Sequence, residues 1–174
     1  ATVYHAIEFA NAAHIPVILN PAPATPKLNI DYACRCDYFI PNETELAILT
    51  NRPVDSIEAI KSAASDLMER GLQHLIVTLG AQGALHLHGA SAGPHASAGL
   101  HASADLYQAP TVKAVDTTGA GDAFIGALAE SLIRDLPLTS AIPRAIRYAS
   151  HSVTRRGTQT AYATASAFDA WQSS

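Results

Sequence analysis

The 174-residue sequence has little charge, few cysteines and no long apolar run. Charged residues make up 15%, the formal net charge is -4, and the densest basic site is the pair Arg155-Arg156. Because phosphate backbones are bound by clustered basic side chains, nucleic acid is excluded as the main partner. No apolar stretch approaches the ~18 residues that a membrane-spanning helix needs, so no membrane partner is expected.

The N-terminal residues and the cysteines indicate the cellular compartment of the protein. The first residues show no basic stretch followed by an apolar core, which argues against a signal peptide. The first residue is Ala1 rather than Met, so we expect the chain to begin within a longer protein. Cys34 and Cys36 are too close in sequence for an ordinary disulfide or a zinc knuckle. Two reduced thiols indicate a cytoplasmic protein.

Hydrophobic residues make up 48% of the sequence, enough to bury the core of one domain over residues 1–174. Periodicity predicts helices at 3–13, 42–50, 55–70, 122–134, 139–152 and 165–171, and strands at 16–20, 37–40, 74–79, 84–88, 106–109 and 111–115. This alternation predicts an α/β fold, a parallel sheet with helices on both faces. In the first helix, Val3, Ile7, Phe9 and Ala10 share one apolar face. Residues 89–105, rich in Ala, Ser, Gly and His, predict a long mobile hairpin tip.

The segment Asp116-Thr117-Thr118-Gly119-Ala120-Gly121-Asp122 precedes an apolar helix. Its glycines let backbone N–H groups approach a ligand, and a helix N-terminus adds partial positive charge. The segment therefore predicts an anion hole of phosphate size. Asp122 at its mouth could take a proton from an attacking hydroxyl. The alternative is that Asp122 is only the N-cap of the helix.

The motif DTTGAGDAFIGAL resembles the C-terminal signature of the ribokinase (pfkB) family of sugar kinases. The resemblance implies that Asp122 is the catalytic base and that Gly119, Ala120, Gly121 and Asp122 form the anion hole. It also implies a ribokinase-like three-layer fold with a mostly parallel central sheet, whose N-terminal half and lid lie outside this chain. The sequence lacks GxxxxGK[ST], so it does not resemble a P-loop kinase.

Asn42-Glu43-Thr44-Glu45 resembles the family's N-x-x-E motif. The resemblance implies that Asn42 lies near the nucleotide phosphates and that Glu45 organises Mg²⁺ through water. The alternative is a capping box, in which Asn42 caps the helix and Glu45 reaches back to it.

Two further loops resemble family loops. The loop after the strand at 74–79 resembles the ATP-contacting loop, which implies contacts from Thr78, Leu79, Gly80, Ala81, Gln82 and Gly83; the alternative is an ordinary glycine turn. The loop at 152–159 resembles one that holds a monovalent cation, K⁺, and the implied ligands are Asp116, Thr118, Ser152, Arg155, Gly157 and Ala161. Ala161 stands where the family often has Ser. For Arg155-Arg156 the alternative is a solvated basic pair.

Among the eight histidines, His86 and His88 alternate on the predicted strand at 84–88, and His95 and His101 lie in the Ala-rich segment. A metal site there is conceivable, but histidines of an exposed loop without fixed geometry are the favoured interpretation.

The resemblance implies ATP-dependent phosphorylation of a sugar hydroxyl, with Mg²⁺ and K⁺ as cofactors. Asn20-Pro21-Ala22-Pro23-Ala24 favours a ribokinase, hence D-ribose and its 5-hydroxyl. The alternatives are another sugar or nucleoside kinase of the family, such as a fructokinase, and a non-catalytic nucleotide-binding fragment. The full-length protein is expected to be a homodimer, and this half alone is expected to be inactive and either unstable or self-associating.

Overall fold

The computed structural model describes residues 2–89 and 103–172, which form two compact units. The first unit comprises residues 1–79 and 85–106, and the second comprises 80–84 and 107–174. Most of the predicted mobile tip at 89–105 lies outside the described residues. In the part of the chain that the structure describes, no helix is long and apolar enough to cross a membrane.

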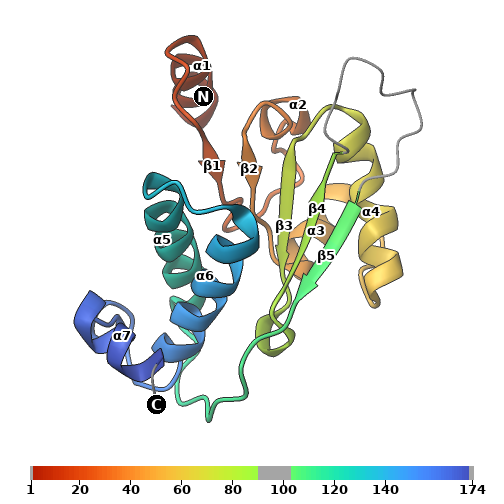
Figure 1. Ribbon diagram of the computed structural model, residues 1–174. Helices are drawn as coiled ribbons and strands as arrows, with labels where there is room; N and C mark the ends of the chain where they lie inside the picture. Colours follow the sequence, from red (N-terminus) through yellow and green to blue (C-terminus); the bar gives the residue numbers. More distant parts are fainter. Residues whose placement is uncertain (1, 90–102, 173–174) are drawn as a thin grey trace. The chain divides into compact units, whose positions relative to one another are not determined.

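The first unit is built on a five-stranded sheet with strands in the order β1-β2-β3-β4-β5, seen in Figure 1. Its elements are α1 (Thr2–Ala12), β1 (Ile18–Leu19), α2 (Ile30–Ala33), β2 (Tyr38–Phe39), α3 (Glu43–Thr50), α4 (Ile57–Glu69), β3 (His74–Thr78), β4 (Ala84–His88) and β5 (Ser103–Tyr107).

The sheet combines parallel and antiparallel pairing. β1 pairs with β2 and β2 with β3 in parallel, with Tyr38 opposite His74. β4 follows β3 after a short turn and runs antiparallel to it, since the N–H of Gly89 bonds to the carbonyl of Gln73 at 3.4 Å. The predicted parallel pairing is therefore found at β1–β3, and the hairpin of β3 and β4 adds antiparallel pairing.

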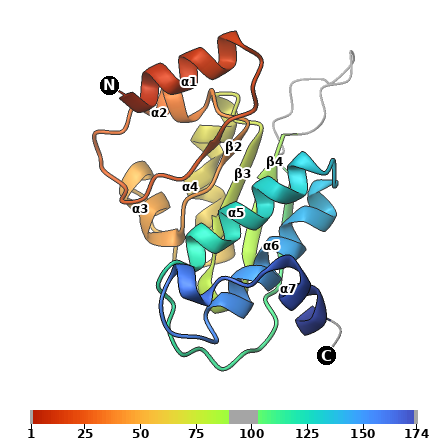
Figure 2. The ribbon, with the colours of Figure 1, turned by 90° about the vertical axis from the view of Figure 1, so that its left-hand side faces the viewer.

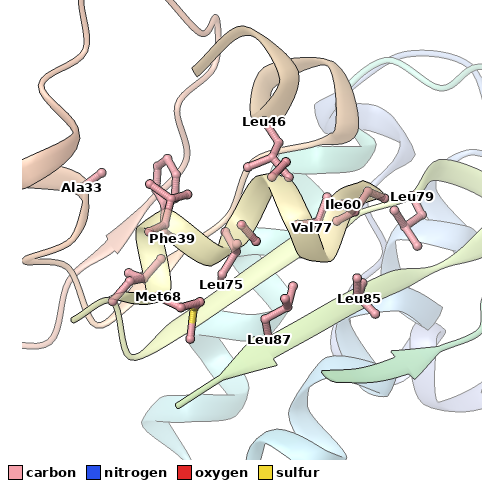
Figure 3. Packing of buried hydrophobic residues seen from close by; sticks show 14 residues of the cluster. Ala33, Phe39, Leu46, Ile60, Met68, Leu75, Val77, Leu79, Leu85 and Leu87 are labelled. Atoms are coloured by element: carbon pink, nitrogen blue, oxygen red, sulfur yellow. The ribbon is translucent and has the colours of Figure 1, made fainter. Parts of the chain in front are cut away.

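Helices α3 and α4 cover one face of the sheet. Figure 3 shows Leu46 of α3 and Ile60 of α4 packed over Leu75 and Val77 of β3, with Leu85 and Leu87 of β4 beside them. The amphipathic pattern of α4 produces this contact, because its apolar residues recur at helical spacing. Burying such side chains stabilises the unit by about 1.5–3 kcal/mol each.

The opposite face of the strands carries a row of rings. Tyr38, His74, His86 and His88 follow one another across β2, β3 and β4, with neighbouring ring centroids 4.8–5.2 Å apart; Tyr38 stacks on His74, and the histidine rings are tilted against each other. His74 Nδ1 lies 3.1 Å from His86 Nε2. Burial lowers the pKa of His86 to about 4 and also lowers that of His74, so both rings are neutral near pH 7. Neutral rings can pack together without charge repulsion.

The second unit contains α5 (Ala120–Ile133), α6 (Leu138–Ser152) and α7 (Ala165–Gln172), with the short 3-10 helices η1 (Gly80–Gln82) and η2 (Gln159–Ala161). Figures 1 and 2 both show α5 and α6 side by side. An ion pair of 3.2 Å between Glu130 of α5 and Arg144 of α6 joins them. Tyr148 of α6 meets Phe168 of α7 edge to face, with centroids 5.0 Å apart.

The structure corrects three predictions about elements. Residues 111–115 form no strand, and the strand predicted at 106–109 is β5, which begins at Ser103. The apolar face predicted for α1 is buried only at Ile7, since Val3 and Phe9 are 49% and 65% exposed. Helix α2 was not predicted, because its four residues are too few to show a period.

Candidate functional site

The turn before α5 is held by the carboxylate of Asp116. Asp116 Oδ1 accepts a hydrogen bond of 3.0 Å from the N–H of Thr118, and Oδ2 accepts one of 3.0 Å from the N–H of Gly157. These bonds, the one from Gly157 first, lower the pKa of Asp116 to about 2. The carboxylate therefore stays ionised at neutral pH and joins the turn to the loop after α6.

The backbone strengthens the same junction. The carbonyl of Val153 accepts bonds from the N–H groups of Val115 and Asp116, at 2.7 and 3.2 Å. Tyr162 donates its hydroxyl to the carbonyl of Gly119 at 3.0 Å. The residues at 115–119 are thus fixed from two segments that lie far along the sequence.

Gly119 is the N-cap of α5, with φ of 79° and no side-chain cap bond. The alternative in which Asp122 is the N-cap is therefore wrong, because Asp122 lies in the first turn of the helix and is exposed. The N–H of Ala120 bonds to the carbonyl of Thr117 at 3.2 Å. Within the described residues, no backbone acceptor is found for the N–H groups of Gly121 and Asp122. Free N–H groups and the helix dipole at this end favour an anion.

The six residues predicted around K⁺ make different contacts in the structure. Hydrogen bonds of Asp116 connect it directly to Thr118 and Gly157. The hydroxyl of Ser152 bonds instead to the carbonyl of Ala149 at 2.8 Å, while the Ser152 carbonyl accepts from Arg155 N–H at 3.4 Å. Ala161 is buried at the end of η2, where its N–H bonds to Thr158. The cluster of three at Asp116 supplies one ionised carboxylate and nearby backbone carbonyls, which are hard oxygen ligands.

Asn42 and Glu45 form the capping box of α3. Asn42 Oδ1 accepts from the N–H of Glu45, and Glu45 Oε2 accepts from the N–H of Asn42, both at 2.8 Å. The capping alternative is therefore confirmed as the local structure. The box occupies Oε2 of Glu45, whose side chain is buried, and Asn42 is exposed.

The start of α3 lies beside the end of β3. Asn42 forms a parallel bridge with Thr78, and the N–H of Thr78 bonds to the carbonyl of Pro41 at 3.0 Å. Both segments follow parallel strands, so their loops emerge at the same edge of the sheet, where α/β proteins bind ligands. Among the predicted ATP contacts, Thr78 is half-buried and Leu79 is 4% exposed.

The remaining predicted ATP contacts belong to the second unit. Gly80, Ala81 and Gln82 form η1 and are exposed, and the N–H of Gly83 bonds back to the carbonyl of Gly80 at 3.2 Å. Gly83 has φ of 109°, and a Cβ there would lie 2.0 Å from the carbonyl oxygen of Tyr107. The turn therefore needs glycine at this position.

Sequence reasoning missed Tyr162 and Val153, whose contacts with the turn come from distant segments and leave no local pattern. Arg156 was considered only as part of a solvated pair, yet its charge contributes to lowering the pKa of Asp116. A motif read along the chain cannot show such long-range partners.

Comparison with known proteins identifies the family. The model of the family described as "pfkB family carbohydrate kinase" matches residues 1–165. The chain belongs to the pfkB family. Its curated relatives include the deoxyribokinase of Salmonella typhi, 44% identical over 172 residues, which cover 99% of this chain and 52% of that protein. The ribokinase of Schizosaccharomyces pombe is 38% identical over 158 residues, which cover 87% of this chain and 45% of that protein.

Solved structures show the same fold. Ribokinase from Thermotoga maritima matches with a TM-score of 0.79 and 30% identity, covering 97% of this chain and 52% of that one. Arabidopsis thaliana ribokinase, solved with ribose and ATP, matches with a TM-score of 0.83 and 23% identity, covering 97% and 51%. The fold is therefore ribokinase-like, and the chain spans about half the length of the relatives it matches.

Replacing Gly119 with Ala tests the geometry of the turn. We expect Gly119→Ala to lower the free energy of unfolding by about 1–3 kcal/mol, because φ is positive there and the new Cβ would lie 2.8 Å from Tyr162 Oη. Urea denaturation followed by circular dichroism measures the change. Gly126→Ala is the control, since that glycine lies inside α5 with open space around it and should be neutral or stabilising. An equal loss of unfolding free energy in the two variants would contradict the geometry described for Gly119.

Proposed function

We propose that these residues are the nucleotide-binding and catalytic part of a longer enzyme, the parent protein. This enzyme transfers the γ-phosphoryl group of ATP to a primary hydroxyl of a pentose. The observation that carries the proposal is the N-terminus of α5, where exposed Asp122 accompanies two N–H groups without a backbone acceptor. Membership in a carbohydrate-kinase family supports it.

In the proposed reaction, the Asp122 carboxylate accepts the proton of the sugar hydroxyl. The hydroxyl oxygen bonds to the γ-phosphorus while the bond from that phosphorus to the bridging oxygen of ADP breaks. The N–H groups of Gly121 and Asp122 and the dipole of α5 stabilise the charge on the phosphoryl oxygens. Gly119 and Ala120 contribute by shaping the turn, since the Ala120 N–H already bonds to Thr117.

The nucleotide is proposed to contact Asn42, Thr78 and Leu79 and the turn at 80–83, of which Gly80, Ala81 and Gln82 are exposed. Mg²⁺, when bound with ATP, neutralises charge on the phosphates. Glu45 fits a role through water, because the capping box uses Oε2 and leaves Oε1 available to a hydration shell. Asn42 fits a phosphate contact because its side chain is exposed at the start of a helix.

K⁺ is proposed to bind beside the turn, with Asp116, Thr118, Ser152, Arg155, Gly157 and Ala161 around it. The support is the ionised carboxylate of Asp116, which already links Thr118 and Gly157. A cation held there would strengthen the junction that orients the anion hole.

The proposed phosphoryl acceptor is the 5-hydroxyl of ribose. The parent protein is proposed to be a cytoplasmic homodimer. The 44% identity to a deoxyribokinase makes 2-deoxyribose a second candidate. The two sugars differ in one hydroxyl, and comparing kcat/KM of the parent protein for each decides between them. Other sugar or nucleoside acceptors, such as fructose, belong in the same assay.

Asp122→Asn in the parent protein tests the catalytic role. We expect kcat to fall by roughly 100- to 10,000-fold, the usual contribution of a positioned general base, while the affinity for ATP stays unchanged. A coupled assay of ADP release and calorimetric ATP binding measure the two quantities. Asp135→Asn, a carboxylate just beyond the other end of α5, is the control and should keep full activity. Turnover of Asp122→Asn near the normal rate would refute the role.

An activity assay on the 174-residue chain alone distinguishes the catalytic part of a kinase from a complete kinase. We expect no ATP-dependent phosphorylation of ribose or deoxyribose, because the resemblance implies that the sugar-binding residues lie elsewhere in the parent. We also expect self-association in light scattering, since Val3, Phe9 and Ile15 are 49–65% exposed. Sugar phosphate formation by this chain would contradict the expectation. Nucleotide binding without turnover by the parent protein itself would favour a non-catalytic nucleotide-binding protein.

A further inference from the structure

Three side chains that have no part in the proposed kinase chemistry lie close together on strands β4 and β5 of the first unit. His86 and His88 come from β4 and Asp105 from β5, the neighbouring strand in Figure 1. One ligand atom from each lies within 4.8 Å of the others. His88 Nε2 and Asp105 Oδ2 are 3.2 Å apart.

The strand pattern places the two histidines on one face. Leu85 and Leu87 face the core under α4, so His86 and His88 project from the other side of β4. Cα atoms two residues apart on a strand are separated by about 6.6 Å, yet the two ring centroids are only 4.8 Å apart. The rings therefore lean toward each other.

The spacing suits a transition-metal ion. In a tetrahedral zinc site with bonds of about 2.0–2.1 Å, neighbouring ligand atoms lie about 3.3 Å apart. The 3.2 Å between His88 Nε2 and Asp105 Oδ2 is close to this distance. Two imidazoles and a carboxylate match the ligands of Zn²⁺ sites that keep a fourth position for water.

His74 supplies the outer contact that such sites use. Its Nδ1 lies 3.1 Å from Nε2 of His86, and Tyr38 stacks on it from the other side. A ligating histidine is commonly oriented by a hydrogen bond at its second ring nitrogen. When His86 donates Nε2–H to His74, its Nδ1 keeps the lone pair for a ligand. His86 is 4% exposed, whereas the side chains of His88 and Asp105 are 30% and 53% exposed and give an ion access.

We propose that His86, His88 and Asp105 form a binding site for a divalent transition-metal ion of the Zn²⁺ class, with His74 orienting His86. The site is separate from the kinase chemistry proposed above and does not depend on it. All four residues belong to one unit, so the site is complete within that unit.

Titration of the 174-residue chain with Zn²⁺, in competition with a chromophoric chelator, tests the site. We expect one tight equivalent, and Co²⁺ in its place should give the visible absorption of a four-coordinate ion. His88→Ala and Asp105→Asn should each weaken binding about 100-fold or more, and His74→Gln about tenfold, since outer contacts alone are worth about 10- to 100-fold. Both His88 and Asp105 are partly exposed, so these variants should keep the circular dichroism of the wild type.

Two controls separate this site from adventitious binding by other histidines. His5→Ala removes an exposed histidine of α1 and should leave the affinity unchanged. The double substitution His95→Ala/His101→Ala should also leave it unchanged. The proposal is overturned if the double variant abolishes binding, if His88→Ala and Asp105→Asn bind as tightly as the wild type, or if the wild type binds no equivalent tightly.

Discussion

The candidate site depends on one carboxylate, that of Asp116. Each of its oxygens accepts a backbone N–H, one from Thr118 and one from Gly157, and these donors are separated by 39 positions along the chain. A short turn with glycines at 119 and 121 has many accessible conformations, and fixing each residue costs about 1–2 kcal/mol of entropy. Bonds to a charged acceptor are about twice as strong as neutral ones, so they can offset that cost.

The consequence reaches the first turn of α5. With Asp116 fixed, Gly119 occupies its left-handed conformation under the hydroxyl of Tyr162, and α5 begins at the next residue. The N–H groups of Gly121 and Asp122 then remain for an anion. Asp122 is exposed at the same helix end, so one short segment presents both the proposed base and the proposed charge stabilisation.

Much of the architecture could be predicted from sequence, and the exceptions have physical reasons. The pattern of α4 and the continuous apolar run of β3 identified both elements, since a buried face fixes the period. Residues 111–115 are rich in β-branched side chains, but among the described residues no strand pairs with them. The glycine turn before α5 was predicted from its motif, whereas Tyr162 and Val153 could not be, because only the tertiary fold brings them to it.

The histidines illustrate the same limit. Alternation in sequence shows that His86 and His88 share a face, but not that β5 brings Asp105 beside them or that His74 lies on the next strand. His86 and His88 lie in β4, as predicted from their alternation on the strand at 84–88, and His86 is buried. His95 and His101 lie outside the described residues.

The most direct test of the account is the turnover of the parent protein carrying Asp116→Asn. Asn keeps the size of the side chain but has only one oxygen, so its amide would face an N–H donor at Thr118 or Gly157. If Asp116 positions the anion hole, kcat should fall about 100-fold, the cost of a misplacement of roughly 1 Å, with the melting temperature recorded to confirm the fold. An unchanged kcat in a folded variant would contradict the claim that this carboxylate organises the site.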